Sequence, residues 1–191
     1  LEIRGAGSLF GYKQSGHITT VGFEMYCELL KEEILKTSKT NQRKSFRPPV
    51  NYYKNAYINK RYIKSESERL SFYQKLSKIK LDRELEELKL ETIDRYGPLL
   101  TETKNLFYIT SVSLLFYGPL VKNILLEQNL LQIDIMNYLD SNQFETLLKN
   151  ISLFERKNNL QVSYQNKNKD IFSVSFLCKI NIRVGSNIAV L

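Results

Sequence analysis

The polar residues with the most distinctive spacing lie in the glycine-rich start of the 191-residue chain, where Arg4 and Gln14 stand ten positions apart. An arginine offers five donors in a rigid fork that suits carboxylate or carbonyl groups. A glutamine both donates and accepts hydrogen bonds, and glycines let two backbones approach closely. Half of the eight glycines of the chain lie here: Gly5, Gly7, Gly11 and Gly16. From the residues alone, Arg4 could bond helix-end carbonyls while Gln14 lies in an exposed loop.

Other kinds of chemistry find little support in the sequence. No G-x-x-x-x-G-K-[ST] phosphate-binding loop occurs, and no nucleophile has an evident base beside it. His17 is the only histidine, and Cys27 and Cys178 are the only cysteines. A structural zinc site or a disulfide framework would need more such residues, so we expect two free thiols in a reducing cytoplasm. We therefore predict neither a catalytic site, a metal nor a cofactor within these residues.

The chain is basic, with a net charge of +8. A basic balance favours polyanionic partners, but lysine is spread along the whole sequence without one dense stripe. Lys13, inside the glycine-rich segment, is a weak candidate for contact with a DNA phosphate. A tyrosine cluster further on could stack on bases or, more simply, cover an edge of the core: Tyr52, Tyr53, Tyr57 and Tyr62. No apolar run is long enough to cross a membrane, so we expect no membrane partner.

Two parts are predicted on either side of a polar break. Apolar residues recur at helical spacing over 20–36, which predicts an amphipathic helix. The following residues are polar and basic and close with Pro48 and Pro49, which disfavour helix. The sequence therefore predicts a helical segment over 1–40, a linker over 41–50 and a domain over 51–191.

Within the predicted domain, helices come before strands. Residues 51–63 alternate loosely and are expected to be extended. Ser65 and Glu68 form a capping box that opens a helix. Asp82 is expected to cap a second helix that stops at Gly97. Thr101 opens a third, which should be the most buried because apolar residues cover much of its circumference.

The last third of the chain changes character. Apolar residues at 131, 133 and 135 alternate with polar ones and predict a strand. Asp140 and Ser141 should cap a further helix. Two more alternating runs, at 160–164 and 172–178, flank the polar residues 166–170 and predict a hairpin. Helices first and an antiparallel sheet later indicate an α+β domain.

Several of these residues also carry a family resemblance. The glycine-rich start and the helix after it resemble the end of the second motor lobe of transcription-repair coupling factors and, more distantly, of RecG-type branch-migration helicases. Later segments are similar to the C-terminal domain of the coupling factors. The segments in question are Leu1–Gly7, Gln14–Gly16, Val21–Tyr26, Ala56–Ile58, Arg69–Tyr73, Leu85–Leu88 and Ile93–Leu99.

The resemblance implies that the chain is the carboxy-terminal fragment of an ATP-dependent DNA translocase. Such a protein displaces RNA polymerase stalled at DNA damage and recruits nucleotide excision repair. ATP and magnesium would be bound upstream of Leu1, in the parent protein. Double-stranded DNA and RNA polymerase would be partners of the parent, as would the excision-repair damage-recognition protein. The motif that couples hydrolysis to movement along DNA would comprise Arg4, Gly5, Gly7, Gln14 and Gly16.

The resemblance further implies a regulatory role for the terminal domain, which would dock on the amino-terminal module and mask its surface. Here Lys54, Asn59, Lys60 and Arg61 stand where the relatives tend to carry acidic residues, which changes the charge available for docking. The alternative is a stand-alone protein- or nucleic-acid-binding module without a motor. A protease cut within 37–50 that leaves a stable core of 51–191 would favour the fragment interpretation.

Overall fold

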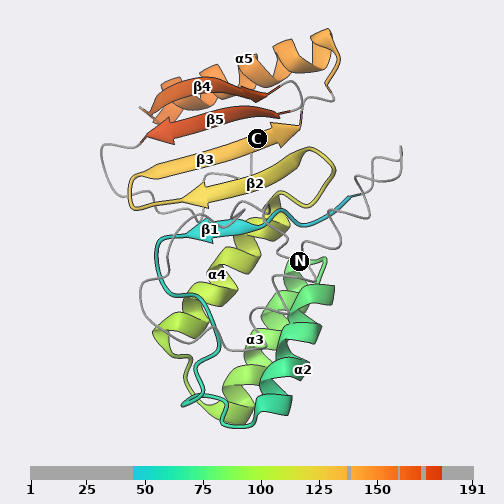
Figure 1. Cartoon of the computed structure of the whole chain (residues 1–191), viewed down its shortest axis with the longest axis vertical. Coiled ribbons are helices and arrows are strands. Elements are labelled where there is room, and N and C mark those ends of the chain that lie inside the picture. The colour runs from blue at the N-terminus through green and yellow to red at the C-terminus, as the bar shows by residue number, and fades with distance from the viewer. Residues whose placement is uncertain (1–44, 137–138, 159, 169–170, 178–191) are drawn as a thin grey trace, which may run out of the picture.

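The helices that come first in the chain and the sheet occupy opposite ends of the molecule. The computed structural model describes residues 45–136, 139–158, 160–168 and 171–177, so the predicted helix at 20–36 lies outside the described residues. Figure 1 shows most of the helices gathered at one end, a sheet at the other, and the last helix alongside the far strands of the sheet. These helices are α2 (Glu66–Lys78), α3 (Asp82–Tyr96), α4 (Thr101–Leu115) and α5 (Ser141–Asn158). The predicted α+β class is confirmed.

The sheet has five strands and is antiparallel except at one edge. The strands are β1 (Val50–Tyr52), β2 (Val121–Leu126), β3 (Leu130–Met136), β4 (Gln161–Asn168) and β5 (Ile171–Leu177). Their order across the sheet is β1-β2-β3-β5-β4, and β1 runs parallel to β2. The predicted hairpin of the last two strands is confirmed. Strand β2 was not foreseen from the sequence, and β1 precedes the helices, so the sheet is not wholly later in the chain.

Side-chain caps fix where two of the helices begin. The Oγ of Ser65 accepts the Glu68 N–H at 3.4 Å, as its capping box predicts. The carboxylate of Asp140 accepts the Gln143 N–H at 2.8 Å, which confirms that Asp140 caps α5. These bonds satisfy backbone donors that have no partner within the helix.

The N-cap of α3 lies one residue before the predicted one. Its N-cap is Leu81, so the prediction that Asp82 caps the helix is wrong. Instead the Glu84 carboxylate accepts the N–H groups of Lys80 and Leu81 at 2.9 and 3.1 Å. These two backbone hydrogen bonds favour the charged form and lower the pKa of Glu84.

Two hydrophobic clusters hold the elements together. The first joins α2, α3 and α4, and among its buried members are Phe72, Tyr73, Leu76, Leu85, Leu88, Leu106 and Phe107. The second joins one face of the sheet to Ile151 of α5 and Val112 of α4. Tyr52 and Tyr108 pack against both clusters. Helix α4 carries eight buried residues, so the prediction that it is the most buried of the three helices that come first is confirmed.

The extended segment predicted over 51–63 ends at Tyr52, so the prediction is wrong beyond that residue. Ala56, Ile58 and Ile63 are buried because they pack into the helical cluster. The backbone N–H groups of Ile58 and Ile63 donate to a side chain or to a nearby residue rather than to a neighbouring strand. The Ile58 N–H, for example, donates to the Tyr73 hydroxyl at 2.8 Å.

The described part of the predicted linker packs into the domain. Phe46 and Arg47 are buried, and the backbone of Phe46 exchanges two hydrogen bonds with Gly118, at 3.1 and 3.0 Å. The Ser113 hydroxyl donates to the Pro48 carbonyl at 2.6 Å. Residues 46–49 thus belong to the packed structure, while the boundaries at 1–40, 41–50 and 51–191 stay a prediction.

Limited proteolysis is expected to release a stable core that begins before Phe46, because proteases need exposed and extendable backbone. Mass spectrometry of the fragments would identify the first residue of the core. A dominant cut between Phe46 and Val50 would contradict this packing.

Candidate functional site

The residues to which the sequence assigned a coupling or DNA-binding role all lie outside the described residues. They are Arg4, Gly5, Gly7, Lys13, Gln14 and Gly16. Their roles stay predictions.

Among the described residues, a shallow groove between α2 and α3 brings charges of both signs together. The groove has a volume of about 60 Å³ and is open to solvent. Its lining comes from both helices: Glu68, Ser71, Phe72, Lys75, Leu88, Glu91, Thr92, Arg95 and Tyr96. We refer to these nine residues as the α2–α3 groove.

Helical periodicity places these side chains together. Glu68, Ser71 and Lys75 are spaced three and four residues apart on α2. Leu88, Glu91 and Arg95 repeat the spacing on α3. Residues three and four apart lie on one face of a helix, so each helix presents a single stripe to the groove.

Ion pairs cross the groove from one helix to the other. Lys75 Nζ lies 2.7 Å from Glu91 Oε1, and Arg95 Nη2 lies 3.0 Å from Glu68 Oε1. Arg95 Nη1 lies 3.9 Å from the same Glu91 oxygen. All four side chains are about half exposed. Exposed pairs of this kind contribute about 1 kcal/mol or less to stability.

The floor of the α2–α3 groove is apolar, and the hydroxyl of the buried Thr92 already has a hydrogen-bond partner. Phe72 and Leu88 are buried at the base. The Thr92 hydroxyl donates to the Leu88 carbonyl at 2.6 Å. At the rim the Arg95 guanidinium lies 5.1 Å from the centroid of the Tyr96 ring. An apolar centre bordered by paired charges is typical of a protein-binding surface.

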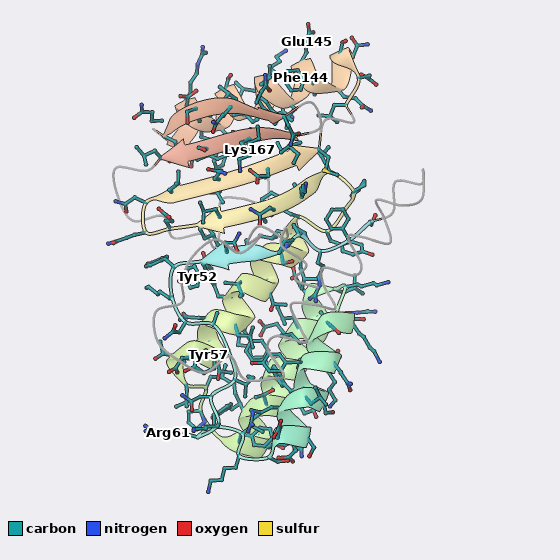
Figure 2. All side chains as sticks on the ribbon, viewed as in Figure 1. Tyr52, Tyr57, Arg61, Phe144, Glu145 and Lys167 are labelled. Carbon is teal, nitrogen blue, oxygen red and sulfur yellow. The ribbon has the colours of Figure 1, made fainter. Side chains whose placement is uncertain are left out.

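A second polar cluster lies on the sheet, and the sequence did not indicate it. Asp134 alternates with apolar residues in β3, which suggested a solvent-facing side chain, yet it is only 7% exposed. Lys167 Nζ donates to its two oxygens at 2.8 and 2.9 Å, and the Ser173 hydroxyl donates at 2.6 Å. Gln132 Nε2 donates at 3.2 Å. Figure 2 shows Lys167 over the sheet.

The charge of Asp134 is stabilised by these contacts. Burial alone would raise the pKa of Asp134. Hydrogen bonds from Lys167, Ser173 and Gln132, with the charge of Lys167, outweigh burial and hold the pKa below its ordinary value. Asp134 thus fastens β4 and β5 to β3. We assign this cluster to stability.

Two further kinds of site were sought within the described ranges. No three His, Cys, Asp or Glu side chains there gather as metal ligands would. None of the helices in those ranges is both long and apolar enough to cross a membrane.

Comparison with known proteins gives a consistent result. Residues 53–147 match the family described as the TRCF domain. The "Transcription-repair-coupling factor" of Buchnera aphidicola is 36% identical over 154 residues, which cover 78% of this chain and 19% of that protein. The protein of the same name from Haemophilus influenzae is 40% identical over 121 residues, which cover 60% of this chain and 10% of that protein.

The chain thus spans a fifth or less of these curated relatives. A solved structure described as "Crystal structure of C-terminal domain of transcription-repair coupling factor" superposes with a TM-score of 0.49 at 19% identity. The superposition covers 71% of this chain and 83% of that one. On the sequence matches, this chain belongs to the transcription-repair coupling factors and contains their C-terminal TRCF domain.

Proposed function

We propose that this chain is the carboxy-terminal part of an ATP-dependent DNA translocase that displaces RNA polymerase stalled at DNA damage. The translocase would then recruit nucleotide excision repair. The match of residues 53–147 to the TRCF domain carries this proposal, and the names of the relatives support it. ATP, magnesium and double-stranded DNA would be bound by the parent protein. The segment with Arg4 and Gln14 would couple hydrolysis to movement.

Within that protein, the TRCF domain would act as a reversible clamp on the amino-terminal module. Its docking surface would be the α2–α3 groove, which combines an apolar floor with half-exposed charges of both signs. Clamping would hide the surface that binds the excision-repair damage-recognition protein. Engagement of polymerase would shift the equilibrium towards release, because a ligand that binds only the open form draws the population to it.

Charge reversal in the α2–α3 groove of the full-length protein is expected to open the clamp. Glu91→Arg places a cation beside Lys75 and Arg95, so it removes both ion pairs of Glu91 and changes the charge offered to the docking partner. We expect ATP hydrolysis without polymerase to rise about threefold, which corresponds to a coupling of about 0.7 kcal/mol. Pull-down of the damage-recognition protein should increase in parallel.

A matched control lies on the same helix. Glu86→Arg reverses an exposed carboxylate that pairs with Lys89 outside the groove. Hydrolysis and pull-down should remain at the level of the unmodified protein. Equal effects of the two substitutions, or no effect of either, would contradict docking through the groove. Thermal unfolding of both variants would exclude loss of the fold.

A further inference from the structure

A long loop between β1 and α2 carries positive charge without any negative charge. Residues 53–64 contain four cationic side chains, three tyrosines and no aspartate or glutamate. We refer to residues 53–64 as the basic loop. Loops of about a dozen residues without secondary structure are uncommon in compact domains and are often functional. The cations are Lys54, Lys60, Arg61 and Lys64.

None of these four cations is neutralised by a carboxylate within the described ranges. All four are exposed. Within the described residues, Lys75, Lys89, Arg95 and Lys167 each pair with a carboxylate, whereas other exposed cations such as Lys78 and Arg83 do not. The basic loop differs from those isolated cations because it holds four such side chains within one segment that contains no acidic residue. Unpaired cations clustered on one loop leave their charge available to an external anion.

The basic loop is held in place by hydrogen bonds at several points. The Asn105 amide donates to the Asn55 carbonyl at 2.7 Å. The Asn59 side chain accepts the Arg61 N–H at 2.9 Å. Arg69 Nη1 donates to the carbonyls of Ile63 and Lys64, both at 2.8 Å. A loop fixed in this way loses little conformational entropy when it binds a ligand.

Aromatic rings lie among the cations of the basic loop. The Tyr53 side chain is 47% exposed, and the Lys54 ammonium lies 5.1 Å from its ring centroid. Tyr57 is partly exposed. Figure 2 shows Tyr52, Tyr57 and Arg61 along the same margin of the molecule, so this side of the loop combines rings and charge. The Tyr62 ring is already occupied, because it packs against the helical cluster and lies 5.9 Å from the Tyr96 ring.

We propose that the basic loop binds single-stranded nucleic acid, with phosphates on its cations and bases against Tyr53 and Tyr57. Grooves that combine cations with exposed rings bind single strands because every base has a face on which a ring can stack. A duplex offers phosphates but keeps its bases stacked inside, so it would leave the rings unused. This activity is separate from docking through the α2–α3 groove, which lies on other residues.

Fluorescence anisotropy with a labelled oligothymidylate would test the proposal on the full chain. The fourfold variant Lys54→Gln, Lys60→Gln, Arg61→Gln and Lys64→Gln should bind at least about tenfold more weakly at low salt. The slope of log affinity against log salt should become shallower by about 3, at about 0.7 per phosphate released from a single strand. Tyr53→Ala should weaken binding about tenfold with little change in slope.

Two matched controls separate the loop from general charge. A second fourfold variant neutralises exposed cations on or beside the helices: Lys78, Lys80, Arg83 and Lys157. It lowers the net charge of +8 by the same four units and should retain most of the binding. Tyr164→Ala removes a ring of similar exposure from β4 and should have no effect.

Three results would overturn the proposal. Equal losses of affinity in the two fourfold variants would show that binding depends only on net charge. Unchanged binding in the loop variant would place the nucleic acid elsewhere in the chain. Tighter binding of a duplex of the same length, with no effect of Tyr53→Ala, would exclude recognition of single strands.

Discussion

The substitution Asp134→Ala is expected to lower the free energy of unfolding by about 2 kcal/mol, because it leaves the buried Ser173 hydroxyl without its acceptor and removes the bonds from Lys167 and Gln132, which water replaces in part. Lys167, Ser173 and Gln132 all donate to this carboxylate. Urea unfolding followed by circular dichroism would measure the loss. Asp94→Ala is the control, since Asp94 is exposed and appears in no ion pair within the described residues. A loss below about 1 kcal/mol would contradict the role of the Asp134 cluster.

The same carboxylate predicts a dependence on pH. The pKa of Asp134 is lower in the folded protein than its ordinary value, which is about 3.9 in an unfolded chain. The folded state therefore binds the proton less readily, and the contribution to stability is complete above about pH 5. It is lost as the pH falls through the folded pKa. The difference in stability between the native protein and Asp134→Asn should thus shrink in acid.

Gly97→Ala is expected to destabilise the domain by about 2 kcal/mol, through its backbone alone. Gly97 ends α3 with φ +82° and ψ −166°, a conformation that only glycine adopts readily. An added Cβ would have no atom within 4 Å, so no steric clash contributes. Differential scanning calorimetry would detect the expected fall in Tm of several degrees.

Gly118→Ala is the matched control for Gly97→Ala. Gly118 also has open space where a Cβ would be placed, and its φ lies outside the positive range. We expect a change within about 0.5 kcal/mol. A similar loss at both glycines would show that the positive φ of Gly97 is not the cause.

Local signals in the sequence located most of the elements. Ser65 with Glu68, Asp140 and Gly97 each act through bonds or dihedral angles within a few residues, so their types alone indicate where helices begin and end. Alternation of apolar residues located β3, β4 and β5.

What the sequence missed depends on contacts between distant segments. Asp134 is buried because Lys167 and Ser173, more than thirty residues away, neutralise and bond it. Strand β2 carries Lys122 and Asn123 at its start, which obscures the alternation that would indicate a strand. Apolar and polar residues alternate in the basic loop because one side of it packs on helices. The same alternation would occur in a strand, so the residues of the loop do not distinguish a loop from a strand.

The candidate site was only partly accessible to sequence reasoning. The stripes of Glu68 and Lys75 on α2 and of Glu91 and Arg95 on α3 look like ordinary solvated helix faces. Only the packing of the two helices brings them together as the α2–α3 groove. The glycine-rich residues that the resemblance singled out lie outside the described residues.

The parallel edge of the sheet also bears on the order in which the domain folds. Val50 pairs with Ile124, so β1 joins β2 only after the chain has traversed α2, α3 and α4. Closing so long a loop costs much more chain entropy than forming local contacts does. This cost falls if the intervening helices have already packed together. Strands β4 and β5 are consecutive in the chain, and Asn168 pairs with Ile171. We therefore expect hairpin and helices to form early and β1 to join last.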